Sequence, residues 1–108
     1  MISIEEFGKV ELRVATVTAA EAHPNADRLV VLSVDLGDEQ RQLVAGIRAH
    51  YTTEELVGRQ IVVVANLQPA KLRGVESQGM LLAATDASSG GVIVLSPEKQ
   101  VAPGSKVS

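Results

Sequence analysis

The amino-acid sequence predicts an all-β fold: a five-stranded, partly open Greek-key barrel with short helices and a C-terminal extension. Short apolar segments with strand periodicity alternate with turn-forming residues at roughly 8–12-residue intervals. A helix-start signal lies between the third and fourth of these segments. The 108 residues fit one domain. A β-sandwich is the alternative, but it needs more strands than this chain offers.

The first part of the chain predicts one helical turn and one long strand. Ser3 and Glu6 have the spacing of a capping box. Gly8 is expected to end this turn, with Phe7 folded onto the barrel. From Val10 onward, apolar residues alternate with charged ones, which is typical of a half-buried strand, here reaching to about residue 22.

The rest of the chain predicts four more barrel strands and a second helical turn. Thr52 and Glu55 form another capping box, and Gly58 is expected to stop that helix in the left-handed conformation. The predicted barrel strands cover residues 29–36, 41–47, 61–65 and 80–84, and a further strand covers 92–95 before a mostly extended and looping tail. A helix between the third and fourth strands indicates the oligonucleotide/oligosaccharide-binding (OB) type of barrel. We expect the barrel at about 9–86 and the extension at about 87–108.

Charge is distributed unevenly along a chain whose formal net charge is −3. Residues 40–75 contain more cations than anions, and this zone is compatible with a phosphate-binding face or with a chance distribution. No segment has the length and apolarity of a membrane span, and the N-terminus lacks a signal pattern. We therefore expect a cytoplasmic protein with no membrane partner.

Nothing in the sequence indicates catalysis, a metal site or a bound cofactor. His23 and Asp27 lie in a predicted turn, without the strand–helix framework of a nucleophile. His23 and His50 belong to different segments, and the chain has no cysteine. Phosphate-binding glycine loops are also absent from the sequence. We expect a binding module rather than an enzyme.

The segment 66–80 is the most informative part of the chain, because connections of this length are often functional. It contains Lys71 and Arg73 as candidate phosphate ligands, together with the neutral side chains of Asn66, Ser77 and Gln78. The alternative is an ordinary barrel-closing loop with solvated charges. Only Phe7 and Tyr51 are aromatic, so the chain is poorly equipped to stack unpaired bases and suits a folded RNA read by shape.

Several motifs resemble the tRNA-binding domain found at the C-terminus of many bacterial methionyl-tRNA synthetases and in stand-alone dimeric tRNA-binding proteins. The resemblance extends over nearly the whole chain, in order. The matching stretches are VELRV at 10–14, HPNADRL at 23–29, VAGI at 44–47, NL at 66–67, SQGM at 77–80, proline at 97 and PGSKV at 103–107.

The resemblance implies an OB barrel that binds tRNA, with a C-terminal extension that contributes to a homodimer. It places Asn66, Lys71, Ser77, Gln78 and Met80 at the RNA surface, and less strongly Asn25 and Arg28; Arg73 is added as the neighbouring cation. The implied role is a structure-specific accessory domain or partner of methionyl-tRNA synthetase in translation, either linked to it or free-standing. A protein-interaction or secretion-chaperone-like module on the same barrel is the alternative.

Overall fold

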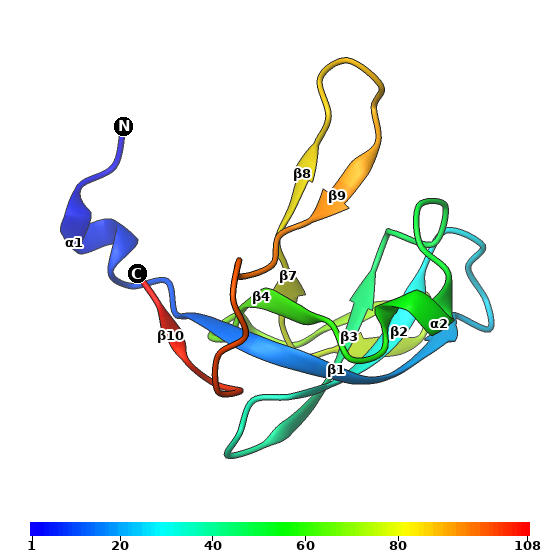
Figure 1. Cartoon of the computed structure of the whole chain (residues 1–108), viewed down its shortest axis with the longest axis horizontal. Helices are drawn as coiled ribbons and strands as arrows, with labels where there is room; N and C mark the ends of the chain where they lie inside the picture. Colours follow the sequence, from blue (N-terminus) through cyan, green and yellow to red (C-terminus); the bar gives the residue numbers. More distant parts are fainter.

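A computed structural model describes residues 1–108. Figure 1 shows a coiled sheet from which the N-terminal segment and one hairpin project. The two short helices are α1 (Ile4–Phe7) and α2 (Thr53–Leu56). The strands are β1 (Leu12–Ala22), β2 (Val30–Asp35), β3 (Gln40–Ala45), β4 (Gln60–Val64), β5 (Ala70–Leu72), β6 (Val75–Ser77), β7 (Met80–Leu81), β8 (Ala83–Thr85), β9 (Val92–Val94) and β10 (Lys106–Val107).

The main sheet is built around β1, which is long enough to pair along two different parts of its length. The order is β3-β2-β1-β4-β7, with β10 also pairing with β1, and all of these pairs are antiparallel. The first half of β1 pairs with β4 and its second half with β2, and the register shifts between Val17 and Ala19. Such an irregularity bends a strand, which lets one sheet curl toward a barrel.

Side chains complete the barrel where β3 faces β6. The backbone N–H of Val44 donates to Ser77 Oγ at 3.0 Å, and the Gln78 N–H donates to the Gln42 carbonyl at 2.8 Å. The Gln42 N–H in turn donates to Gln78 Oε1 at 3.0 Å. These bonds pair the edge of β3, so the sheet is nearly closed and the predicted OB barrel is confirmed.

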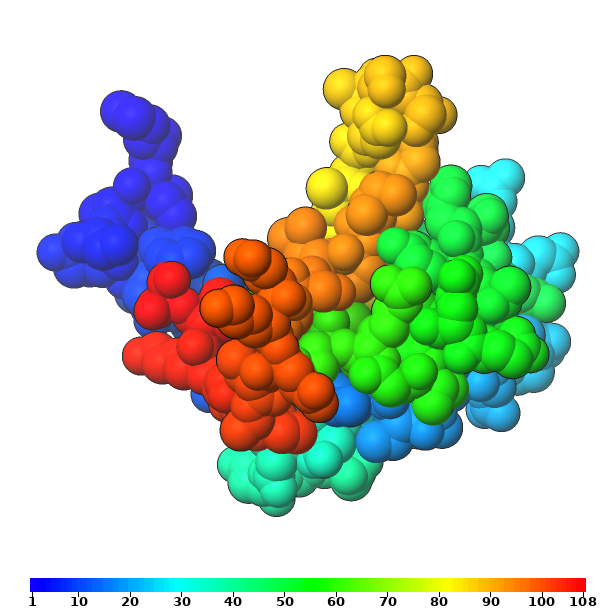
Figure 2. Space-filling view, in the orientation of Figure 1, coloured from blue at the N-terminus to red at the C-terminus, as the bar shows by residue number.

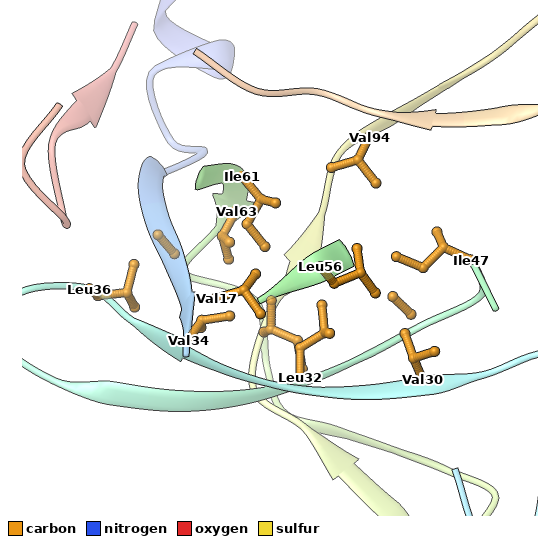
Figure 3. Packing of buried hydrophobic residues seen from close by; sticks show 13 residues of the cluster. Val17, Val30, Leu32, Val34, Leu36, Ile47, Leu56, Ile61, Val63 and Val94 are labelled. Atoms are coloured by element: carbon orange, nitrogen blue, oxygen red, sulfur yellow. The ribbon is translucent and has the colours of Figure 1, made fainter. Parts of the chain in front are cut away.

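The barrel interior is filled by aliphatic side chains from β1 to β4. Figure 3 shows Leu56 of α2 lying among Val17, Leu32 and Ile61. Val30, Leu32, Val34 and Leu36 are fully buried, as the predicted alternation of the second strand requires. Tyr51 lies at the margin of the core, where its hydroxyl accepts a hydrogen bond from the Val94 N–H at 3.0 Å.

Both capping boxes form as predicted, but α1 lies outside the core. Ser3 and Glu6 exchange their reciprocal bonds, and so do Thr52 and Glu55. No residue of α1 is buried, so the expectation that Phe7 folds onto the barrel is wrong. Figure 2 shows the N-terminal segment standing away from the barrel. Local hydrogen bonds define this turn, and nothing in them specifies where it packs.

One further expectation is corrected between residue 66 and the C-terminus. The expected strand 80–84 is broken at Leu82 into β7 and β8, and β8 leaves the barrel to form a projecting hairpin with β9 (Figure 1). The tail is mostly without regular structure, as expected, but its last residues form β10 on the edge of β1. Gly104 has a φ of 87°, and a Cβ there would lie 2.1 Å from the Leu36 carbonyl oxygen, so this approach requires glycine.

None of the helices has the length and apolar character needed to cross a membrane.

Candidate nucleic-acid interface

At one end of the barrel, the 23–29 loop and the tip of the β5–β6 hairpin enclose a shallow hollow of about 380 Å³. Both segments contribute cations to it, although more than forty residues of sequence separate them. The lining residues are Asn25, Ala26, Asp27, Arg28, Leu29 and Arg73. Three predicted RNA-binding residues, Asn25, Arg28 and Arg73, are therefore brought together.

The 23–29 loop is held in shape by backbone hydrogen bonds. The His23 N–H donates to the Leu29 carbonyl at 3.1 Å, and this bond closes the neck of the loop. The Arg48 N–H reaches the Arg28 carbonyl and the Arg48 guanidinium reaches the Ala26 carbonyl, each at 3.4 Å. Arg48 thus adds a cation next to the hollow. Arg48 lies in the basic zone 40–75 but was not among the predicted site residues; its position directly after the VAGI motif was the available signal.

The segment 66–80 contains a β-hairpin rather than an irregular loop. Leu72 pairs with Val75, and the two residues between them, Arg73 and Gly74, have φ values of 54° and 90°. A two-residue turn with both φ values positive matches the twist of the strands and favours Asn-Gly. Arginine is uncommon in this left-handed conformation, and Arg73 is the one non-glycine residue of the chain that adopts it.

The cations that line the hollow, and those on the segments next to it, have no acidic partners. The chain forms only two ion pairs, Arg13 with Asp38 at 2.9 Å and Arg41 with Glu39. No carboxylate therefore lies within ion-pair distance of the side chains of Arg28, Arg48, Lys71 and Arg73. Lys71 does face Glu76 across the hairpin, but the two side chains form no ion pair. Unpaired cations on one surface can bind phosphate groups without first breaking a salt bridge.

Other predicted site residues lie beside this hairpin and have internal hydrogen bonds. Ser77 is buried, and its hydroxyl accepts from the Val44 N–H and donates to the Gly79 carbonyl at 2.9 Å. Gln78 uses its Oε1 for the barrel closure described above, which leaves its exposed amide NH₂ group available. Met80 is 49% exposed. Arg41, another cation that was not among the predicted site residues, donates to the Ala65 carbonyl and, at 3.3 Å, to the Gln78 carbonyl.

Asn66 is set apart from the other candidates by its contacts. Its Oδ1 accepts from the Glu11 N–H at 2.8 Å, and its Nδ2 donates to the Lys9 carbonyl at 2.6 Å. Both ends of this amide therefore hold the segment that connects α1 to β1. The geometry makes Asn66 an anchor for the N-terminal segment.

Two carboxyl groups of the chain have a lowered pKa, and both lie away from the hollow. The pKa of Asp38 is lowered mainly by its hydrogen bond with the Arg13 guanidinium, and the pKa of Asp86 is lowered mainly by the Ser88 N–H. Neither residue lines the hollow. Nowhere in the chain do three His, Asp or Glu side chains come together in a metal-binding arrangement.

Comparison with known protein families shows which family this barrel belongs to. A family model described as "Putative tRNA binding domain" matches residues 12–106. The chain belongs to this tRNA-binding domain family. The resemblance drawn from the motifs is confirmed, and the match includes the 23–29 loop, the β5–β6 hairpin and the tail.

Relatives of this tRNA-binding domain include a large enzyme and small proteins of its own size. The methionine–tRNA ligase of Thermococcus kodakarensis is 55% identical over 106 residues, which are 98% of this chain and 14% of the ligase. The crystal structure of a "MetRS related protein" from Pyrococcus horikoshii superposes with a TM-score of 0.91 at 37% identity, covering 99% of this chain and 97% of that one. The chaperone CsaA of Bacillus anthracis superposes with a TM-score of 0.89 at 34% identity, covering 100% and 99%.

The chain thus spans about one seventh of the length of the ligase that it matches. The matching region is a tRNA-binding domain, which is not catalytic by itself.

Proposed function

We propose that this tRNA-binding domain serves as an accessory module of methionyl-tRNA synthetase in the cytoplasm, either linked to the enzyme or associated with it. The module binds the folded shape of tRNA with little reading of base sequence. Aminoacylation belongs to the enzyme, and this domain raises the affinity for the tRNA substrate. The observation that carries the proposal is the hollow between the 23–29 loop and the β5–β6 hairpin, which is lined by Arg28 and Arg73. Neither these two cations nor the nearby Arg48 and Lys71 have an acidic partner.

The chemistry of this surface favours contacts with phosphate and sugar over contacts with bases. Arg28, Arg48, Lys71 and Arg73 are exposed, so their side chains can approach a phosphate backbone. No aromatic ring lines the hollow, and Tyr51 is half-buried with Arg59 over its ring at 5.6 Å. A surface without stacking platforms suits a folded RNA better than a single strand.

We assign different roles to the remaining predicted residues. Asn25 contributes a neutral amide at the hollow, while Gln78 and Met80 extend the RNA surface along the side of the hairpin. Ser77 and Asn66 act by holding backbone in place, because their polar atoms already have internal partners. RNA affinity then depends on these two residues through the shape of the surface.

We further propose that the domain works as a homodimer, which presents two surfaces to one tRNA. Linking two weak sites can strengthen binding by roughly 10²–10⁴. The support for this is apolar surface on the projecting parts: Ile4 is 77% exposed and Phe7 41%, on a helix with no buried residue. The C-terminal extension adds Ile93, Leu95 and Val101, which are 53%, 43% and 38% exposed. Apolar surface of this kind is typical of protein contacts.

A chaperone-like function is the second candidate, since one specific observation favours it. Leu67, Leu72 and Met80 are 45%, 39% and 49% exposed on or next to the hairpin, and apolar side chains of this kind could contact an unfolded peptide. The similarity to the Bacillus anthracis chaperone is consistent with that function. The negative net charge also weakens the case for a polyanion.

A salt titration with two ligands separates these functions. Folded tRNA and an unfolded apolar polypeptide are titrated against the intact chain from low to moderate salt, with fluorescence anisotropy as the signal. We expect tRNA binding whose affinity falls with salt, because bound phosphates release counterions. Absence of tRNA binding, or a tRNA affinity unchanged by salt, together with tight peptide binding would establish the chaperone function instead.

A further inference from the structure

We propose that His23 is a positioning residue: its neutral imidazole ties the 23–29 loop to the β5–β6 hairpin, so that the cations of the two segments are correctly spaced before RNA binds. The proposal rests on the proposed tRNA-binding function and names the residue that prepares its surface. His23 is the first residue of the HPNADRL motif and has no part in the contacts proposed above.

The ring of His23 joins two segments through opposite edges. Its Nε2 lies 2.9 Å from the Leu72 carbonyl oxygen, and its Nδ1 lies 2.9 Å from the Asn25 backbone nitrogen. A carbonyl can only accept and a backbone N–H can only donate, so the ring carries its proton on Nε2. His23 is only 3% exposed, and water therefore competes poorly for either bond.

The outer part of the β5–β6 hairpin depends on the bond between His23 and the Leu72 carbonyl. Its base is fixed to β3 through Glu76, Ser77 and Gln78. Residues 70–75 make only one hydrogen bond outside the hairpin, and it is the one from His23 to the Leu72 carbonyl. Lys71 and Arg73 flank that carbonyl in the sequence. A two-stranded hairpin is marginally stable alone, so this contact limits how far the two cations can move.

The same residue also shapes the opposite wall of the hollow. The His23 N–H closes the neck of the loop on Leu29, and the ring orders Asn25, which precedes Arg28 by three residues. One buried side chain therefore holds both walls. Fixing binding groups before the ligand arrives lowers the entropy lost on binding, so His23 should contribute to affinity without touching RNA.

Two conservative substitutions separate the bond to the hairpin from the bond within the loop. In His23→Gln, the side-chain amide nitrogen reaches the position of Nε2 and can still donate to the Leu72 carbonyl. In His23→Asn, the shorter side chain can still accept from the Asn25 N–H, as in an Asx turn, but cannot reach the hairpin. His50→Asn is the matched control, since His50 is exposed and its ring makes no hydrogen bond.

The variants are compared by tRNA affinity at one salt concentration and by amide hydrogen exchange of residues 70–77 without RNA. We expect His23→Asn to lose about fivefold in affinity and to exchange the hairpin amides about fivefold faster. His23→Gln should stay within about twofold of the unchanged protein in both measurements. Equal losses in the Gln and Asn variants, or an Asn variant with unchanged exchange and affinity, would overturn the proposal.

The unchanged protein provides a test that does not depend on how the variants fold. Nitrogen NMR of the imidazole should show a neutral ring protonated on Nε2, and a proton on Nδ1 would contradict the proposed contact. If the chain bound no tRNA at all, the proposed function would fail. The exchange rates of the hairpin would still decide whether His23 holds it in place.

Discussion

Gln60 forms a two-point hydrogen bond with the backbone of Val101: its Nε2 donates to the carbonyl at 2.7 Å, and its Oε1 accepts from the N–H at 2.9 Å. The side chain is buried at the start of β4 and reaches the tail across 41 residues of sequence. Arg13 holds the same tail further on, with its Nε donating to the Gly104 carbonyl at 3.2 Å. The tail is therefore an integral part of the barrel.

Replacing Gln60 with Leu should loosen the tail and destabilise the domain. The substitution leaves the N–H and carbonyl of Val101 without their partner, which costs about 1–2 kcal/mol. Chemical denaturation would measure the loss. Gln100→Leu, at an exposed position of the same tail, is the control and should change stability little. An equal, small effect of both substitutions would show that the tail is not held by Gln60.

Replacing Lys71 and Arg73 together with Ala should weaken the binding of all tRNAs about equally. Two fewer phosphate contacts should also lower the salt slope of binding by about two. The charge-matched control replaces Lys9 and Lys99, which lie outside the hairpin. A selective loss of one tRNA would show that bases are read at this surface.

Replacing Arg73 with Asn should raise the stability of the domain and lower its affinity for tRNA. Asparagine tolerates the left-handed backbone of the turn better than arginine, so we expect a gain of up to about 1 kcal/mol in unfolding free energy. Removing the cation should lower tRNA affinity and reduce the salt slope by about one. Thermal unfolding and anisotropy would follow the two effects. Unchanged tRNA affinity would exclude Arg73 from the RNA surface.

Replacing Phe7 with Glu should break the proposed homodimer without unfolding the barrel, since α1 has no buried residue. Sedimentation should show a dimer for the unchanged chain and a monomer for the variant. Val57→Glu, at another exposed apolar position, is the control. Deleting the tail from about Ser96 would be less informative, because it also removes the bonds to Gln60 and Arg13. A monomeric unchanged chain would refute the dimer.

Replacing Asp38 with Asn should lower stability at neutral pH and have little effect in acid. The Arg13 guanidinium holds the pKa of this carboxyl below its usual 3.8 in the folded chain. Its contribution is therefore present above about pH 4 and is lost as the pH falls through the folded pKa. Denaturation of both proteins from pH 7 to pH 2 should show two curves that converge. A constant difference would exclude the ion pair as the cause.

The local elements of this chain were determined by the sequence alone. Strand periodicity predicted β1 to β4, and side-chain spacing predicted both capping boxes, because these features depend on residues a few positions apart. The motifs also identified the family and selected Asn25 and Arg28, and the composition of the segment 66–80 added Arg73; all three line the hollow.

Only the tertiary structure decided which residues act together. Phe7 was expected to fold onto the barrel and is exposed. Asn66 and Ser77 were selected as RNA ligands, although their polar atoms hold distant backbone. Arg48 and His23 gained their importance from partners that other segments supply. The physical reason is that barrel closure pairs residues about 20 to 55 positions apart, and no local pattern encodes such partners.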